Sequence, residues 1–240
     1  MEKIICVLII SFFIYGVSGW IWESLIYPII SGYKIHNSGF LNGPIVPIYG
    51  VGALTVILLF EPQEKIYSLF IEGAVIACVI EYFTSWIMEK IYHQRWWDYS
   101  DRHFHINGRI CLEGFLLFGV FSVVCVRFVQ PYLSQKILQY DLTLLIIIST
   151  VLSTLLIVDI IYTVIEMAHI NEHIKTIQDE VLEIINNIEK SSTQYRYRTI
   201  IKEEQVNNWI KNKKYRDRRI IKAFPHLIKK KDDYEETHRK

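Results

Sequence analysis

Five apolar stretches, each long enough to cross a lipid bilayer, fill the first 170 residues of this chain. An α-helix rises about 1.5 Å per residue, so the hydrocarbon core of a bilayer needs about 20 apolar residues. The pattern predicts an all-α fold, a polytopic membrane helix bundle with about five transmembrane helices. We expect these helices at residues 4–30, 44–60, 66–88, 110–129 and 142–169. The second is the shortest and begins with Pro44 and Pro47, which is compatible with a broken or re-entrant start.

The charge balance divides the chain into two regions. Residues 1–170 hold 9 Lys and Arg against 13 Asp and Glu, whereas residues 171–240 hold 17 against 12. Such an asymmetry indicates that the two regions lie in different solvents. We therefore predict a transmembrane domain at residues 1–169 and a basic, helical, cytoplasmic C-terminal tail at residues 170–240.

Lysine and arginine residues in the short loops indicate the orientation, because positive charges favour the cytoplasmic side of a membrane. The loops 31–43 and 89–109 hold more of them than the loops on the opposite side, and the basic tail follows on the same side. We expect both loops and the tail in the cytoplasm and the N-terminus outside.

Three carboxylates lie at positions where a bilayer tolerates few charges. Glu23, Glu81 and Asp159 fall within the first, third and fifth apolar stretches. A charged side chain at membrane depth costs at least about 2.5–3.5 kcal/mol on insertion scales, so it normally faces a partner or a wet cavity. We interpret the three as a candidate intramembrane polar site for an ion or a proton. The alternative is that they are hydrogen-bonded structural groups.

The loop 89–109 is the densest polar and aromatic patch in the chain. We expect Trp96, Trp97 and Tyr99 to form an interfacial platform. We expect the charged residues to make ion pairs or to hold an anionic group such as a lipid headgroup. Asn42 and Asn107 each precede a glycine at the end of a cytoplasmic loop, which suggests a repeated hairpin. The candidate loop site comprises Asn42, Arg95, Trp96, Trp97, Asp98, Asn107, Arg109 and Glu113.

Two members of this loop site have a structural interpretation. Glu113 lies one helical turn after Arg109 at the start of the fourth stretch. An ion pair between residues i and i+4 on a helix is therefore the slightly favoured prediction for this pair.

Signatures of metal binding and catalysis are weak or missing. His103-x-His105 lacks a third spaced ligand, and we therefore expect no metal and no cofactor. The sequence contains no phosphate-binding loop, no His-Glu-x-x-His and no Gly-x-Ser-x-Gly elbow. We expect no enzyme activity from this chain, with a membrane enzyme acting on lipid headgroups as a minor alternative.

Beyond residue 169, apolar residues recur every three or four positions among polar ones. This narrow seam predicts a helix that needs a partner, because its apolar stripe cannot be satisfied in water. The partner is either a second copy, giving a homo-oligomer through a coiled coil at residues 170–188, or another part of the same chain. The basic and apolar residues of the last fifty positions fit adhesion to anionic lipid rather than to nucleic acid. The seam residues are Ile170, Ile174, Ile177, Val181, Ile184 and Ile188.

Several long motifs resemble a known family. They are Gly19-Trp20-x-x-Glu23, Gly39-Phe40-Leu41-Asn42-Gly43-Pro44-x-x-Pro47-Ile48-Tyr49-Gly50, Glu81-Tyr82-x-x-Ser85, Arg95-Trp96-Trp97-Asp98-Tyr99-Ser100 and Asn107-Gly108-Arg109-Ile110-Cys111-Leu112. Together they resemble the bacterial membrane proteins described as ABC-transporter permeases of the CmpB type, over roughly residues 10–130. The stretch 219–225 is similar to the C-terminal end of that family. The resemblance implies a multi-pass protein of the bacterial cell (inner) membrane, and it brings neither a substrate nor a catalytic residue.

These features lead us to expect one of two functions. The first is a transport-related, permease-like subunit in which Glu23 and Glu81 line a polar site near the cytoplasmic half of the bilayer. Its ATPase would be a separate subunit, because this chain has no phosphate-binding loop. The alternative is a non-transporting membrane scaffold or sensor, with a lipid-reading cytoplasmic loop and a helical tail that binds a partner or dimerises.

Overall fold

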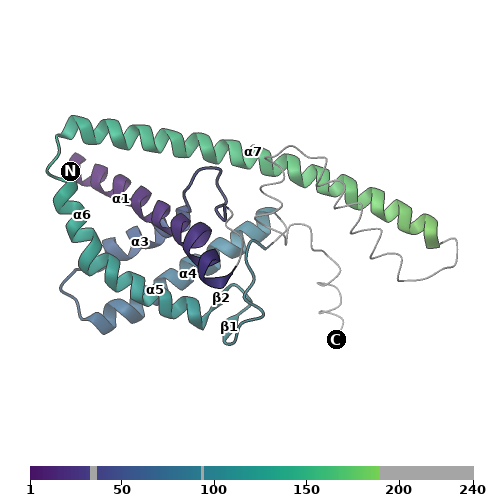
Figure 1. Ribbon diagram of the computed structural model, residues 1–240, viewed down its shortest axis with the longest axis horizontal. Coiled ribbons are helices and arrows are strands. Elements are labelled where there is room, and N and C mark those ends of the chain that lie inside the picture. Colours follow the sequence, from purple (N-terminus) through teal and green to yellow (C-terminus); the bar gives the residue numbers. More distant parts are fainter. Residues whose placement is uncertain (33–36, 93–94, 190–240) are drawn as a thin grey trace. The chain divides into compact units, whose positions relative to one another are not determined.

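The computed structural model describes residues 1–32, 37–92 and 95–189 of the chain (Figure 1). Most of them are helical, as the sequence predicts, and two short strands pair as one antiparallel hairpin. In chain order the elements are α1 (Glu2–Ile21), the π-helical turn η1 (Trp22–Ile26), α2 (Tyr27–Ser31), α3 (Pro47–Leu59), α4 (Ile66–Tyr92), β1 (His105–Ile106), β2 (Ile110–Cys111), α5 (Leu112–Val124), the π-helical turn η2 (Cys125–Val129), α6 (Gln130–Ile137) and α7 (Leu142–Glu189).

Four continuous apolar segments in the described chain are long enough to cross a membrane: Glu2–Ile30, Ile66–Tyr92, Leu112–Ile137 and Leu142–Ala168. Their ends differ from the predicted ends by several residues. The helix predicted at 44–60 is shorter, since α3 has only 13 residues, or about 20 Å against the roughly 30 Å hydrocarbon core. Pro47 lies in its first turn, and Val46 before it has extended dihedral angles, because a residue that precedes proline is disfavoured in helical geometry.

The helices α1 and α3 pack closely and antiparallel. The N–H of Val46 donates to the carbonyl oxygen of Gly16 at 3.0 Å, and Gly50 lies against Phe12. Rising residue numbers in α3 therefore meet falling numbers in α1. Since Gly16 is halfway along Glu2–Ile30, α3 begins beside the middle of the first span. The short helix thus runs beside only the first half of the segment Glu2–Ile30.

This packing depends on a missing side chain. A Cβ atom at position 50 would lie 2.8 Å from the backbone oxygen of Phe12 and 2.6 Å from its ring. The backbone of α1 cannot move without separating the helices, so we expect Gly50→Val to cost about 1–3 kcal/mol of stability, as overpacking does. The matched control is Gly52→Val, because a Cβ at Gly52 meets nothing within 4 Å. Thermal unfolding in detergent should show a lower melting temperature only for the first variant; equal melting temperatures would contradict this interface.

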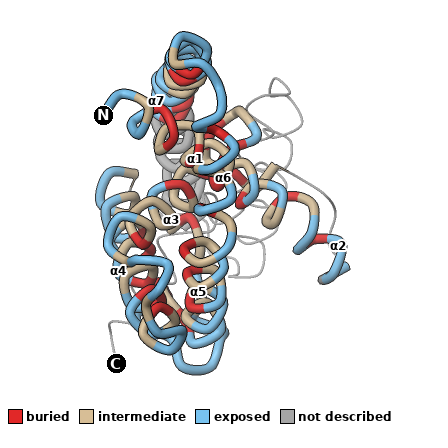
Figure 2. The backbone as a smooth tube through the Cα atoms, turned by 90° about the vertical axis from the view of Figure 1, so that its left-hand side faces the viewer, coloured by how far each residue is buried: buried red, intermediate tan, exposed pale blue. Residues whose placement is uncertain are grey.

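The helices α4 and α5 form a second antiparallel pair. Gly73 lies against Ser122, and Gly119 lies against Phe70, so small residues again permit close approach. Figure 2 shows the buried residues of both helices on the sides that face each other. The opposite face of α4 exposes apolar residues at helical spacing, as lipid contact requires. These residues are Ile71, Val75, Val79 and Phe83.

Both π-helical turns lie just before a proline. Pro28 follows η1, and Pro131 follows η2. Proline has no N–H and its ring clashes with the carbonyl group four residues earlier, so the helical hydrogen bonds shift to a wider turn. Each turn holds a charged residue, Glu23 in η1 and Arg127 in η2.

The last helix continues beyond the apolar stretch. α7 runs from Leu142 to Glu189 without a break, 48 residues in all, and residue 169 is therefore not the end of a helix. The chain divides into two compact units, Met1–Ile160 and Ile161–Lys240. The side chains of the seam at 170–188, the basic C-terminal stretch and the motif at 219–225 lie outside the described part of the structure.

Candidate functional site

The chain before α3 lies at membrane depth as non-helical backbone. Residues 39–46 form bends and extended structure, and the bond from Val46 to Gly16 places their end beside the middle of the first span. Such a segment is stable in a membrane only where its peptide groups find partners within the protein or in water. We call residues 37–46 the re-entrant segment.

Asp159 of α7 anchors this segment. Its Oδ1 accepts a hydrogen bond from the N–H of Asn42 at 3.1 Å, and its Oδ2 accepts one from the N–H of Gly43 at 2.9 Å. Hydrogen bonds to an ionised acceptor are roughly twice as strong as neutral ones. The carboxylate of Asp159 therefore accepts hydrogen bonds from two backbone N–H groups that have no partner within a helix. This role matches the structural alternative predicted for Asp159.

The π-helical turn η1 holds the other end of the re-entrant segment. In η1 the N–H of Tyr27 bonds to the carbonyl of Trp22. This leaves the carbonyl oxygen of Glu23 to accept a hydrogen bond from the hydroxyl of Ser38 at 3.2 Å. In return, the N–H of Ser38 donates to the hydroxyl oxygen of Ser24 at 3.1 Å.

Two carboxylates, that of the half-buried Glu23 and that of the buried Glu81, each accept a hydrogen bond from a tyrosine. The hydroxyl of Tyr49 donates to Oε1 of Glu23 at 2.9 Å, and the hydroxyl of Tyr99 donates to Oε1 of Glu81 at 3.1 Å. Tyr99 lies outside the spans. Burial raises the pKa of its hydroxyl, and the carboxylates of Glu81 and, more weakly, Glu23 raise it further. The hydroxyl of Tyr99 therefore lies within electrostatic range of both Glu81 and Glu23.

The second oxygen of Glu81 distinguishes this acid from Glu23 and Asp159. Glu81 is 8% exposed, and its Oε2 has no hydrogen-bond partner among the described residues. Gly114 of α5 lies next to this oxygen, since a Cβ there would be 4.0 Å from it. Within the described chain, neither Glu81 nor Glu23 forms a salt bridge. A buried carboxylate without a counter-charge is strongly disfavoured, and a proton or a cation is what normally compensates such a group.

The predicted ion pair between Arg109 and Glu113 is wrong. Arg109 is buried, pairs with Glu89 and donates to the hydroxyl of Ser85 at 3.1 Å, both on α4. Glu113 pairs instead with Arg102 at 3.0 Å. The hairpin of β1 and β2 is the cause, because it precedes α5 and directs Arg109 toward α4 rather than along α5.

The aromatic residues of the loop differ in how far they are buried. Trp96 is 6% exposed, and its ring packs against Phe40 and Tyr92, with centroids at 5.1 Å and 5.6 Å. Trp97 is half-buried and donates to the carbonyl of Arg109 at 3.1 Å. The predicted interfacial platform is therefore wrong for Trp96, because the loop folds onto α4 and the re-entrant segment. Tyr99 is half-buried and donates to Glu81.

The charged residues Arg95 and Asp98 of the loop make ion pairs, one of the two predicted alternatives. Arg95 Nε lies 3.4 Å from Glu89, and its Nη1 lies 3.7 Å from Asp98. The same Nη1 donates to the carbonyl of Asn107 at 3.2 Å. Asn107 has φ of 52°, which the tight turn before Gly108 requires.

The two asparagines from the suspected repeat have different roles. Asn42 is held through its backbone by Asp159, whereas the side chain of Asn107 donates to the hydroxyl of Tyr82 at 3.0 Å.

Sequence reasoning did not identify Tyr49 and Tyr99 as partners of the acids. The sequence does contain one signal for these contacts. Each tyrosine follows a helix that holds one of the acids, and each belongs to a motif with polar residues or prolines. No group of three or more potential metal ligands occurs among the described residues.

A comparison with known protein families finds a match over most of the spanning region. The model of the family described as "Putative ABC-transporter type IV" (ABC_trans_CmpB) matches residues 10–164, which include the re-entrant segment, both acid–tyrosine pairs and Asp159. No curated protein and no solved structure matches the chain significantly.

Proposed function

The chain belongs to the family described as "Putative ABC-transporter type IV", and we propose that it acts as the membrane-spanning subunit of a transporter. Glu81 and Glu23 are its intramembrane polar site, and a separate ATPase subunit supplies the energy. This chain binds and releases the transported species but catalyses no reaction itself. The observation that carries the proposal is the buried Oε2 of Glu81, which has no hydrogen-bond partner among the described residues.

The surroundings of Glu81 support transport over a purely structural role. Many transporters interrupt a spanning helix near the middle of the membrane and place the substrate site at that interruption. Here α3 begins halfway through the bilayer, and Tyr49 in its first turns binds Glu23. The acids therefore lie beside a break in a span rather than inside a continuous helical interface.

We expect Glu81→Gln to abolish transport while leaving the amount of folded protein nearly unchanged. The amide oxygen can still accept the Tyr99 hydrogen bond, so only the charge and the proton-binding capacity are lost. Complementation of a deletion strain reports function, and membrane abundance with melting in detergent reports folding. The matched control is Glu72→Gln, because Glu72 is an exposed acid on the same helix that accepts from Ser68.

Loss of folded protein in the Glu81→Gln variant would favour the structural alternative. Removing one partner from a buried hydrogen bond typically costs about 1–3 kcal/mol. A structural carboxylate would therefore lower stability and function together. Full complementation by the variant would exclude Glu81 from the transport site.

A scaffold function is the second candidate, and the length of α7 favours it. Forty-eight helical residues span about 72 Å, more than twice the hydrocarbon thickness. About half of α7 therefore extends beyond the bilayer. On this proposal the extension recruits a partner or a second copy through the seam at 170–188.

Charges placed in the seam test this second candidate. We expect Ile177→Asp combined with Ile184→Asp to separate the oligomer or release the partner, because each carboxylate would be buried in an apolar contact. Size in detergent, measured by light scattering, should fall while the spanning helices stay folded. An unchanged size, together with a monomeric isolated segment 168–192, would show that the seam does not drive self-association.

The orientation is also part of the proposal. The positive charges of the loops 31–43 and 89–109 support a cytoplasmic position of both loops and of the C-terminal tail in a bacterial cell. The re-entrant segment then enters the membrane from the cytoplasmic side, and the acids lie in the cytoplasmic half of the bilayer.

A further inference from the structure

Two apolar side chains at the hairpin of β1 and β2 are exposed. Phe104, just before β1, is 81% exposed, and Ile106, the last residue of β1, is 58% exposed. The backbone of Phe104 has a φ of 55°, a left-handed conformation that residues other than glycine adopt rarely. A strained backbone that presents apolar side chains outward indicates a contact surface rather than a core. We call Phe104 and Ile106 the hairpin pair.

Backbone hydrogen bonds fix the hairpin pair beside the start of α5. The N–H of Leu112 donates to the carbonyl oxygen of Phe104 at 3.1 Å, and Ile106 is the strand partner of Ile110. Leu112 is the first residue of the span Leu112–Ile137. Figure 1 shows the hairpin at this end of α5. The hairpin pair therefore lies level with the end of a membrane span.

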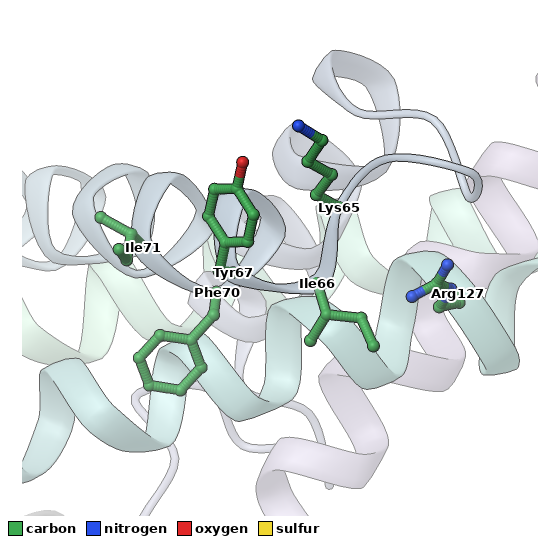
Figure 3. Close-up of a pocket in the computed structure, with 6 residues that line it drawn as sticks. All are labelled: Lys65, Ile66, Tyr67, Phe70, Ile71 and Arg127. Atoms are coloured by element: carbon green, nitrogen blue, oxygen red, sulfur yellow. The ribbon is translucent and has the colours of Figure 1, made fainter.

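The opposite end of α4 locates the other boundary of the membrane. An open hollow at this end is lined by residues from the start of α4 and from η2, among them Ile66 and Arg127 (Figure 3). Ile66 begins the span Ile66–Tyr92, and the connection before it, residues 61–65, holds two glutamates, a glutamine and a lysine. Ile66 and Arg127 therefore lie at about the same depth, where the hydrocarbon core meets the headgroups.

Two helices measure the distance from this boundary to the hairpin. Leu112 precedes Arg127 by 15 residues along α5 and η2, or about 22 Å of helix axis. On α4, Tyr82 follows Ile66 by 16 residues, or about 24 Å, and its hydroxyl accepts a hydrogen bond from the side chain of Asn107 in the hairpin turn at 3.0 Å. The hydrocarbon core is about 30 Å thick. About 6–8 Å of that core therefore lies beyond Leu112 and Tyr82, where the hairpin is.

The hairpin pair continues the apolar surface of α5. Leu112 and Leu116 are 45% and 48% exposed, at the helical spacing of a stripe that contacts lipid. Beside Leu112, Glu113 forms an ion pair with Arg102 at 3.0 Å, so their charges compensate each other at this depth. The guanidinium of Arg102 can also reach the headgroups while its stem stays in apolar surroundings. The neighbours of the hairpin pair are thus compatible with the edge of the hydrocarbon core.

We propose that the hairpin is a lipid anchor, in which Phe104 and Ile106 insert between the acyl chains at the edge of the bilayer. Neither side chain offers a hydrogen bond to a headgroup, so the anchor binds the apolar edge of any bilayer. The anchor also acts on the acid site, whether or not that site transports a substrate. The N–H of Tyr99 donates to the carbonyl oxygen of Gly108 at 2.7 Å, and its hydroxyl donates to Glu81. Lipid contact at the hairpin therefore holds Tyr99 on Glu81.

Photocrosslinking tests the lipid contact. Full-length protein with p-benzoylphenylalanine at position 104 is irradiated in nanodiscs of phosphatidylcholine, and mass spectrometry detects covalent adducts. Ester hydrolysis distinguishes them, because only an acyl-chain adduct leaves a fatty acid on the protein. We expect acyl-chain adducts at position 104, as at the lipid-facing control Phe83, which is 55% exposed on α4. The matched control is Asp101, an exposed residue of the same loop, at which we expect none.

Hydrogen exchange tests whether the anchor holds the loop. Phe104→Gly relieves the backbone strain at this position but removes the apolar side chain, whereas Phe104→Leu keeps an apolar side chain. In nanodiscs we expect the amides of residues 105–112 to exchange several-fold faster in Phe104→Gly than in the parent protein, and at nearly the parent rate in Phe104→Leu. A hairpin held only by its own backbone would gain from glycine and exchange more slowly.

Two outcomes would overturn the proposal. Acyl-chain adducts as rare at position 104 as at position 101 would place the hairpin pair outside the hydrocarbon core. Unchanged or slower exchange in Phe104→Gly would show that lipid contact does not hold the hairpin.

Discussion

Asp159→Ala should be the most destabilising single substitution of a polar residue in the spanning region. The change removes the acceptors of two backbone N–H groups, those of Asn42 and Gly43, at membrane depth. Each buried donor left without a partner costs about 1–3 kcal/mol, and more when the lost acceptor was charged. The re-entrant segment should therefore detach from α7, with a large fall in melting temperature and faster proteolysis between residues 37 and 46.

Two other variants provide a graded comparison. Asp159→Asn keeps one acceptor oxygen and should have an intermediate effect. Asp141→Ala is the matched control at the start of the same helix, because Asp141 is an exposed acid that accepts the N–H of Thr143 at 2.9 Å. This hydrogen bond lowers the pKa of Asp141, and loss of such a cap typically costs about 1 kcal/mol. Equal melting temperatures for Asp159→Ala and Asp141→Ala would show that the re-entrant segment does not depend on Asp159.

The apolar pattern predicts the long helices well, because burial in lipid demands long runs of apolar residues. Four long spans and the unusual start of the segment at residue 44 follow from that pattern and from two prolines. The role of Asp159 does not follow from it. A carboxylate in an apolar run indicates a partner, but the partner is the backbone of Asn42, which is 117 positions away in the sequence.

The loop between α4 and α5 also makes contacts that the sequence pattern does not predict. Helical spacing pairs Arg109 with Glu113, whereas the structure pairs Arg109 with Glu89 of α4. Spacing rules assume that both residues belong to one helix, and the hairpin of β1 and β2 removes Arg109 from it. The tyrosine partners of Glu23 and Glu81 were missed for a related reason, since contacts across a loop depend on how the loop folds back.

The transport proposal requires that water can reach Glu81. A site that loads and releases a polar substrate must open to water on at least one side, whereas a structural carboxylate stays sealed between helices. A cysteine reacts with a charged methanethiosulfonate reagent only as the hydrated thiolate. Reactivity at position 81 therefore distinguishes the two roles without knowledge of the substrate.

The experiment uses full-length protein in which the four native cysteines are replaced by alanine. Single cysteines are then introduced as Glu81→Cys, Val79→Cys and Gln63→Cys. Val79 is 48% exposed on the apolar face of α4 and is the lipid-facing control. Gln63 is exposed in the connection before α4 and is the water-exposed control.

The most direct test of the account is the labelling of these three cysteines by a membrane-impermeant, positively charged methanethiosulfonate in right-side-out and inverted membrane vesicles. We predict labelling at position 63 from outside, labelling at position 81 from the cytoplasmic side, and none at position 79 from either side. A cysteine at position 81 that remains as unreactive as the one at position 79 in both kinds of vesicle would contradict an intramembrane transport site at Glu81.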